Sequence, residues 1–200
     1  MRVGIAGYGV VGKTRHRSIE SNTSYKVTAI SESNQEARQS IATDLEVYND
    51  YQSLIANAEI DVIFISLPNQ FAAEATCLSL QKGLHVFCEK PPARTHAELL
   101  EVEKQSLKFP ALKLMYGFNH RFHLSVEKAK ALIKSNSLGR IINMKGVYGK
   151  SQMISFNQTD WRTNREASGG GILLDQGIHM LDLMRYLSGE NFTDVFSIID

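Results

Sequence analysis

The first 118 residues alternate between short apolar runs and stretches in which apolar residues recur at helical spacing. Such runs are typical of strands, and recurrence every three to four residues is typical of amphipathic helices. The predicted strands, in chain order, lie at 1–6, 25–31, 47–48, 61–67, 85–88 and 113–118. The predicted helices lie at 12–21, 35–45, 51–56, 72–81 and 95–108. Strands that alternate with helices predict an α/β fold with a doubly wound parallel sheet.

The pattern changes after residue 118, where we place the boundary between two domains, 1–118 and 119–200. The elements predicted beyond it are a helix at 125–135, a turn at 138–139, a strand at 141–148, a polar loop at 150–168, a helix at 171–187 that stops at Gly189, and the start of a strand at 192–199. A strand at the very end of the sequence has no visible partner. We therefore expect the second domain to be incomplete.

The strand at 1–6 leads directly into a glycine-rich turn, Gly7-Tyr8-Gly9-Val10-Val11-Gly12. This spacing is that of the dinucleotide-binding fingerprint. Its glycines permit a tight turn, close approach of a pyrophosphate and close packing of helix on strand. Glu32, at the end of the next strand, stands where a carboxylate would bind the ribose 2′-hydroxyl. The turn therefore predicts a dinucleotide site; the alternative is a glycine-rich turn in an α/β domain without a ligand.

Glu32 also bears on the choice of cofactor. A carboxylate accepts hydrogen bonds from a ribose 2′-hydroxyl and repels a 2′-phosphate, so we predict NAD. NADP is the alternative, because hydroxyls and a guanidinium that favour a phosphate stand nearby. These groups belong to Ser31, Ser33 and Arg38.

Two further polar motifs stand at the carboxyl ends of predicted strands, which line the ligand crevice of open α/β sheets. Ser66, Pro68 and Asn69 end one strand, and Asn69 is placed to contact ribose or the nicotinamide carboxamide, although Pro-Asn is also an ordinary turn. Glu89 and Lys90 end the next strand, just before two prolines. A lysine there predicts a contact with a hydroxyl or a phosphate. The alternative is a surface lysine before a proline-rich turn.

A glycine cluster at 169–171 precedes Asp175 and His179, which are four residues apart. On a helix these two lie on one face, about one turn apart. A histidine accepts a proton near neutral pH, and a carboxylate orients it and supports its charge. The alternatives are a packed histidine and a metal site with Asp182. We expect no metal, because no cysteine or second histidine nearby completes a ligand set. The remaining histidines, interpreted as packing or surface residues, are His16, His85, His96, His120 and His123.

Composition narrows the class of protein. The 200 residues carry 22 basic and 21 acidic side chains without a basic block, so we expect no nucleic-acid partner. No apolar run is long enough to cross a bilayer and no leader is recognisable, so we expect no membrane partner. Cys77 and Cys88 have neither metal-binding spacing nor a disulfide framework. A reducing cytoplasm fits this usage.

In this order, the motifs resemble those of the Gfo/Idh/MocA oxidoreductases, the glucose–fructose oxidoreductase and inositol dehydrogenase family. The matching pieces are the glycine-rich turn, Pro68-Asn69, Glu89-Lys90-Pro91, Asn119-His120-Arg121-Phe122, Trp161-Arg162, and the glycine cluster through Asp175 and His179. Each piece alone is unspecific, but the ordered set extends over the whole chain. The resemblance implies a Rossmann domain with a bound nicotinamide cofactor, followed by an α/β domain with a large, mostly antiparallel sheet.

The resemblance also implies that a sugar or cyclitol hydroxyl is oxidised. In that reaction Lys90 contacts cofactor and substrate, while His179, paired with Asp175, accepts the hydroxyl proton. The other implied substrate contacts are Asn119, Arg121, Trp161 and Arg162.

Two departures from the family pattern stand out. Phe71 occupies a position after the Pro-Asn turn where family members often carry a histidine. The chain is also considerably shorter than family proteins, so we expect most of the sheet that forms the substrate wall and the oligomer interface to be missing. We expect the full-length form to be a homo-oligomer.

The leading interpretation is an NAD-dependent dehydrogenase acting on CH–OH groups. The expected substrate is a sugar nucleotide or a related sugar derivative, with a free sugar or inositol as the alternatives. One rival function is a non-catalytic NAD(P)-binding regulator, which would have no need to retain Lys90, Asp175 and His179. The other rival is a family member that uses bound NAD for transient oxidation during glycoside cleavage.

Overall fold

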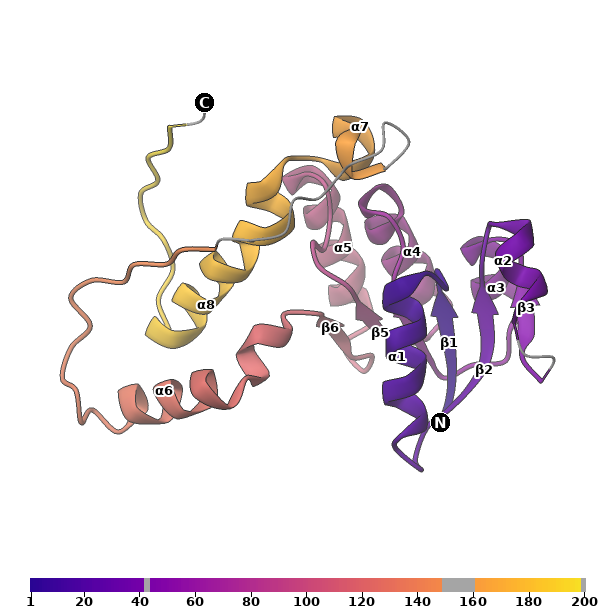
Figure 1. Cartoon of the computed structure of the whole chain (residues 1–200), viewed down its shortest axis with the longest axis horizontal. Helices are drawn as coiled ribbons and strands as arrows, with labels where there is room; N and C mark the ends of the chain where they lie inside the picture. Colours follow the sequence, from indigo (N-terminus) through magenta and orange to yellow (C-terminus); the bar gives the residue numbers. More distant parts are fainter. Residues whose placement is uncertain (42–43, 149–160, 199–200) are drawn as a thin grey trace. The chain divides into compact units, whose positions relative to one another are not determined.

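The computed structural model describes residues 1–41, 44–148 and 161–198. Contacts divide the chain into two compact units, and each is described by itself (Figure 1). Unit 1 holds residues 1–117 together with 161–171, and unit 2 holds residues 118–148 and 172–198. The predicted domains, 1–118 and 119–200, differ from these units mainly in the segment 161–171, which packs with unit 1.

Unit 1 is built on a six-stranded sheet in the order β3-β2-β1-β4-β5-β6. Every neighbouring pair is parallel, as when Val3 of β1 pairs with Val27 on one side and Val62 on the other. The strands are β1 (Arg2–Ala6), β2 (Lys26–Ser31), β3 (Glu46–Tyr48), β4 (Val62–Ile65), β5 (His85–Cys88) and β6 (Leu114–Tyr116). This is the strand order of a Rossmann fold, and it confirms the predicted doubly wound parallel sheet.

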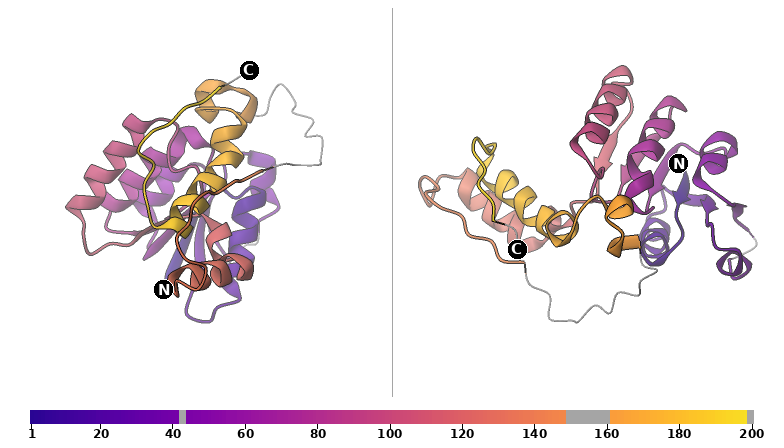
Figure 2. Two further views of the ribbon diagram at one scale, coloured as in Figure 1. Left: turned by 90° about the vertical axis from the view of Figure 1, so that its left-hand side faces the viewer. Right: turned by 90° about the horizontal axis from the view of Figure 1, so that it is seen from above.

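Helices cover both faces of this sheet (Figures 1 and 2). Unit 1 contains α1 (Val10–Glu20), α2 (Gln35–Gln39), α3 (Tyr51–Asn57), α4 (Asn69–Gln81), α5 (His96–Lys108) and α7 (Arg165–Ser168). Alternate strand residues point into two cores, because successive side chains of a strand face opposite ways. Val3 and Ile5 of β1 pack with Ile19 of α1. Ile63 of β4 packs with Leu54 of α3 on the other face.

The helix predicted at 35–45 is shorter than expected. α2 ends at Gln39, and residues 42–43 lie outside the described residues. The hydroxyl of Ser40 donates to the carbonyl oxygen of Ala37 at 2.8 Å. A side chain that bonds the backbone in this way competes with continuation of a helix, which accounts for the early end.

Unit 2 contains the 3₁₀ helix η1 (Asn119–Phe122), α6 (Leu124–Lys134), the π-helix η3 (Leu173–Gly177) and α8 (Ile178–Ser188). The predicted helix at 171–187 is present, but its beginning is the wider π form. It ends as predicted at Gly189, whose φ of 77° is the left-handed conformation that favours glycine.

Two predicted strands of the second domain are wrong for the residues that the structure describes. Segments 141–148 and 192–198 are irregular, so the described part of unit 2 has no antiparallel sheet. A strand needs a neighbour to pair its backbone N–H and C=O groups, and within the described ranges neither segment has one. Among the described residues, no helix is both long enough and apolar enough to cross a membrane.

Candidate functional site

The glycine-rich turn after β1 is tightly packed at its first and third glycines. Gly7 has a φ of +86°, and a Cβ placed on it would lie 2.6 Å from the carbonyl oxygen of Ser66. A Cβ on Gly12 would lie 2.1 Å from the carbonyl oxygen of Gly7. A Cβ on Gly9, by contrast, would meet no described atom within 4 Å. The three glycines therefore match the fingerprint's requirements for a turn, an open approach and a close helix–strand contact.

Groups around Gly9 fit an anionic, partly apolar ligand. Gly9 is the N-cap of α1 and has no side chain to cap the helix, so first-turn N–H groups and the helix dipole favour an anion there. Val10, at the start of α1, is 85% exposed, and Val11 is partly exposed. The hydroxyl of Ser66, just after β4, is buried and has no hydrogen-bond partner among the described residues. A dinucleotide at this turn would cover the exposed valines.

Tyr8, between the first two glycines, is held by α1. Its hydroxyl is hydrogen-bonded to Nδ1 of His16, and Nε2 of His16 lies 3.8 Å from the Glu20 carboxylate. Burial raises the pKa of Tyr8 above its ordinary value, so the phenol stays protonated at neutral pH. His16 was predicted to be a packing residue, but this contact also fixes the side chain of the turn.

Glu32 follows β2, as predicted, and stands beside a guanidinium. Its Oε1 accepts a hydrogen bond from the Asn34 N–H at 2.9 Å. Arg38 donates from Nη1 to the carbonyl oxygens of Glu32 and Ser33, at 2.7 and 2.8 Å. Ser31 is buried, and its carbonyl oxygen accepts from the Gly7 N–H at 3.1 Å. Of the groups that favour a 2′-phosphate, Arg38 and Ser33 therefore remain next to the carboxylate.

Glu89, predicted to bind cofactor, is occupied by an ion pair with α1. Nε of Arg15 donates to Oε1 of Glu89 at 2.6 Å, and the Arg15 guanidinium lies 5.2 Å from the Phe87 ring centroid. Oε2 of Glu89 lies beside Gly117, where an added Cβ would be only 2.7 Å from that oxygen. This carboxylate therefore braces the end of β5 against α1, directly before the half-buried Lys90. The contact of Arg15 with Glu89 was not predicted from the sequence.

Segment 161–171 is anchored to the rest of unit 1 by two polar side chains. Asn69, buried at the start of α4, donates from Nδ2 to the Ser168 carbonyl oxygen at 2.8 Å. Arg94 donates from Nη1 to the Glu166 carbonyl oxygen at 2.5 Å. Gly169 allows this approach, because a Cβ there would lie 2.5 Å from Cβ of Arg94. Asn69 was predicted to contact the cofactor, which stays a prediction; in the structure its amide nitrogen holds the segment 161–171.

Trp161 and Arg162, predicted to shape the substrate pocket, lie together in η2 (Trp161–Thr163). The Arg162 guanidinium stacks on the Trp161 ring at 4.4 Å from its centroid. The other two predicted substrate contacts, Asn119 and Arg121, belong to unit 2.

Arg121 is paired within unit 2. Its Nε donates to Oδ2 of Asp182 at 2.8 Å, and this bond raises the pKa of the guanidinium further. The pairing also removes Asp182 from the metal set considered as an alternative. Among the described residues, no group of three or more acidic, histidine or cysteine side chains is arranged to hold a metal ion. Asn119 is exposed at the start of η1.

Asp175 and His179 lie across the junction of η3 and α8, on consecutive turns. Oδ2 of Asp175 accepts a hydrogen bond from the Gln176 amide at 2.9 Å. His179 is 6% exposed, and its imidazole is surrounded by other rings. The ring centroid of His120 is 4.1 Å away, that of Tyr148 is 6.1 Å away, and Phe118 meets it edge-on at 6.3 Å.

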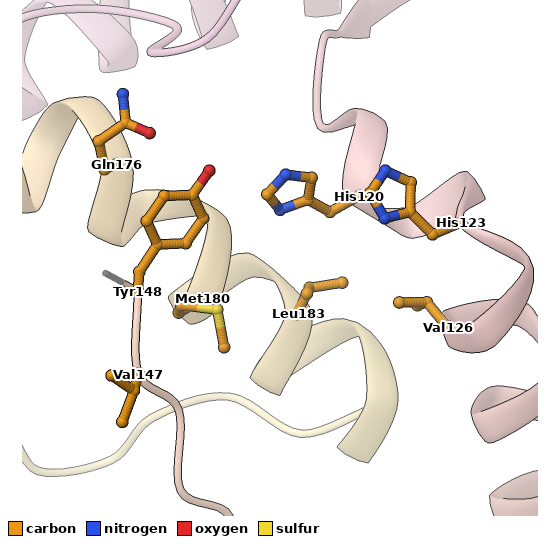
Figure 3. A pocket seen from close by; sticks show the side chains of 8 residues that line it. All are labelled: His120, His123, Val126, Val147, Tyr148, Gln176, Met180 and Leu183. Atoms are coloured by element: carbon orange, nitrogen blue, oxygen red, sulfur yellow. The ribbon is translucent and has the colours of Figure 1, made fainter. Parts of the chain in front are cut away.

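A pocket of about 460 Å³ opens within unit 2 beside these rings (Figure 3). His120, His123 and Tyr148 supply a polar side, while Met180 and Leu183 supply an apolar side. Pockets that mix apolar surface with a few polar groups are typical sites for small molecules. His120 and His123 were interpreted as packing or surface residues. The sequence gives no signal for the contact of His120 with His179, or of His123 with His120, beyond the place of His120 in the Asn119–Phe122 motif.

Three features together define unit 1 as a dinucleotide-binding Rossmann unit. They are its strand order, the three glycines of the turn after β1 (Gly7, Gly9 and Gly12, called the glycine cradle below) and Glu32 after β2. Comparison with known families agrees: residues 1–108 match the model described as "Oxidoreductase family, NAD-binding Rossmann fold", and residues 126–200 match the model described as "GFO/IDH/MocA C-terminal domain". The chain belongs to the Gfo/Idh/MocA oxidoreductase family.

Several characterised relatives are similar over most of the chain. It is 32% identical over 195 residues to D-glucoside 3-dehydrogenase of Escherichia coli, covering 94% of this chain and 54% of that protein. It is 30% identical over 202 residues to levoglucosan dehydrogenase of Pseudarthrobacter phenanthrenivorans, covering 95% and 52%. The crystal structure of myo-inositol 2-dehydrogenase from Lactobacillus plantarum superposes with a TM-score of 0.79 at 27% identity, over 94% of this chain and 56% of that one. The chain thus spans about half the length of the relatives it matches.

Proposed function

We propose that this chain binds NAD and belongs to a dehydrogenase that oxidises a hydroxyl carbon of a sugar or cyclitol. The observation that carries the proposal is the open space at Gly9 between two glycines that admit no side chain. That arrangement leaves the helix start accessible to a pyrophosphate. Glu32 at the end of β2 supports NAD over NADP.

His179 is the proposed general base, and NAD, when bound, supplies the acceptor for the hydride. An imidazole that is neutral near pH 7 takes the hydroxyl proton as the C–H bond breaks. Asp175 supports the charge that His179 gains, with its own carboxylate fixed by the Gln176 amide. Lys90 is proposed to stabilise negative charge that develops on the substrate oxygen.

The substrate class rests on the relatives. Those that resemble this chain include a D-glucoside 3-dehydrogenase, a levoglucosan dehydrogenase and inositol 2-dehydrogenases. These names favour a free sugar, glycoside or cyclitol over the sugar nucleotide expected from sequence. Assembly into a homo-oligomer stays a prediction. The regulator and the NAD-using glycosidase remain the rival functions.

Calorimetric titration with NADH and NADPH, followed by assays of NADH formation, tests the proposal. We expect NADH to bind more tightly than NADPH, and NADH to form from NAD with at least one of myo-inositol, levoglucosan and methyl glucosides. Binding without turnover of any of these would favour the regulator. Sugar release without net reduction of NAD would favour the glycosidase, and no binding of either nucleotide would contradict the proposal.

Replacing Glu32 with serine is expected to shift the ratio of NADH to NADPH affinity toward NADPH about tenfold, or about 1.4 kcal/mol. The substitution removes the acceptor for the 2′-hydroxyl and leaves Arg38 beside the same strand end. Calorimetry with both nucleotides measures the ratio. Glu36→Ser, at an exposed position on α2, is the matched control because it removes the same charge outside this contact. An unchanged ratio in Glu32→Ser would remove Glu32 from cofactor selection.

A further inference from the structure

Three imidazoles in unit 2 form a series from the protein interior to its surface. His179 is buried, His120 is half-buried and His123 is exposed. The ring centroids of His179 and His120 are 4.1 Å apart, and those of His120 and His123 are 5.0 Å apart. The three rings therefore lie in contact, one after another, from the buried His179 to the exposed His123.

We propose that His120 and His123 carry the proton of His179 to solvent, an inference that rests on His179 being the base. In each oxidation the substrate C–H bond gives its hydrogen and two electrons to the nicotinamide, and the O–H proton goes to a ring nitrogen of His179. That proton then passes to a ring nitrogen of His120, to His123 and finally to water or buffer, directly or through single water molecules. All three imidazoles end neutral, ready for the next substrate.

The chemistry of the neighbours selects this route. Among the described residues, the rings of His120, Tyr148 and Phe118 lie near His179. A phenyl ring carries no exchangeable proton, and a phenol ordinarily titrates several units above an imidazole. Of these three rings, the imidazole of His120 has the proton affinity that matches His179, so it exchanges a proton more readily than the other two.

Local structure holds the series in place. His120 and His123 are three residues apart at the end of η1, where the His123 N–H donates to the His120 carbonyl oxygen at 3.2 Å. Side chains three apart in a 3₁₀ turn lie on the same side, which brings the two rings together. The rings of Tyr148 and His120 are nearly parallel, with centroids 5.7 Å apart and planes 17° apart, and Figure 3 shows them side by side.

The charges nearby favour one proton on the series at a time. Two imidazolium rings in contact repel each other, so a proton on His179 disfavours a second proton on His120. Asp175 precedes His179 on its own helix and supports the first charge. Arg121, from η1, and Asp182, from α8, neutralise each other in their ion pair.

The kinetic test compares His120→Phe, which keeps a ring for the stack, with the unsubstituted chain and with His96→Phe, an exposed position at the start of α5. For NAD-dependent oxidation of myo-inositol or levoglucosan, we expect kcat of His120→Phe to fall about tenfold or more. We expect free imidazole in the buffer to restore it several-fold, because a small carrier replaces the missing ring. The His96 variant should respond to neither change. A kcat of His120→Phe that is unchanged, or that imidazole does not raise, would overturn the proposal.

A second measurement needs no turnover and therefore separates this inference from the proposed function. Nuclear magnetic resonance titration of ¹⁵N-histidine-labelled chain should show that His120→Gln shifts the titration midpoint of His179 by about one pH unit, whereas His96→Gln does not. An unmoved His179 midpoint would refute the coupling even in an active enzyme. If the His179 midpoint moves in His120→Gln but the His179→Ala variant turns over normally, the coupling stands and the role of His179 as the base is refuted.

Discussion

The His179→Ala variant is expected to lose kcat by about a thousandfold, while its affinity for NADH stays within about twofold of the unsubstituted chain. General-base catalysis typically contributes factors of about 10² to 10⁴, and the imidazole of His179 is the group proposed to take the hydroxyl proton. The rings of His120, Phe118 and Tyr148, which pack near it, belong to unit 2. The glycine cradle lies in unit 1, so removal of the imidazole leaves those groups in place. Steady-state assays with NAD and calorimetry with NADH measure the two quantities.

Two further variants make this result interpretable. His179→Gln fills more of the buried space than alanine does and still cannot act as a base, so it should lose kcat to a similar extent without a packing defect. His96→Ala removes an exposed histidine outside the site and should leave kcat and NADH affinity unchanged. Near-normal turnover in both His179 variants would exclude His179 as the base.

The cofactor half of the site could be predicted because its determinants are local in the sequence. A positive φ at Gly7 and a Cβ distance of 2.1 Å at Gly12 are demands that only glycine meets, and they leave a fixed spacing in the chain. Glu32 and Lys90 were predicted in the same way, since residues at the carboxyl ends of parallel strands converge on one edge of the sheet, and their roles stay predictions.

Contacts between distant positions were not predictable by the same reasoning. Arg15 and Glu89 are 74 residues apart, and nothing in the helical pattern of α1 shows that Arg15 reaches the end of β5. His120 was interpreted as a packing or surface residue, because nothing in the sequence shows that the ring of His179, 59 positions away, lies against it. The apolar spacing at 173–177 fits an α-helix and a π-helix almost equally, so the wider turn was missed.

The strands expected at 141–148 and 192–199 failed for a different physical reason. Apolar patterning indicates a surface that prefers to be buried, but a strand forms only where another strand supplies hydrogen-bond partners. Within the described residues of unit 2 no such partner is present. Sequence periodicity therefore predicts strands reliably in unit 1, where each strand has a parallel neighbour, and less well where pairing is unknown.

The Gly9→Ala variant is expected to fold as stably as the unsubstituted chain and to bind NADH about thirtyfold less tightly, a loss of about 2 kcal/mol. The backbone at Gly9 is extended, with φ of −73° and ψ of −160°, so alanine is accommodated without strain. A Cβ there meets no described atom within 4 Å, so the folded chain has room for it. The same methyl group would stand where the pyrophosphate must approach the backbone. Thermal unfolding and calorimetry with NADH measure the two effects separately.

Two companion glycines distinguish a cofactor contact from a folding requirement. Gly171→Ala also adds a methyl group that meets no described atom within 4 Å, so it should change neither stability nor NADH affinity. Gly12→Ala places its Cβ against the backbone carbonyl of Gly7, so it should lower both together. If Gly9→Ala bound NADH normally, the pyrophosphate would not lie on this turn and the assignment of the cradle would fail. If it lost stability as Gly12→Ala does, the space at Gly9 would be needed by the fold itself, and binding could not be attributed to ligand access.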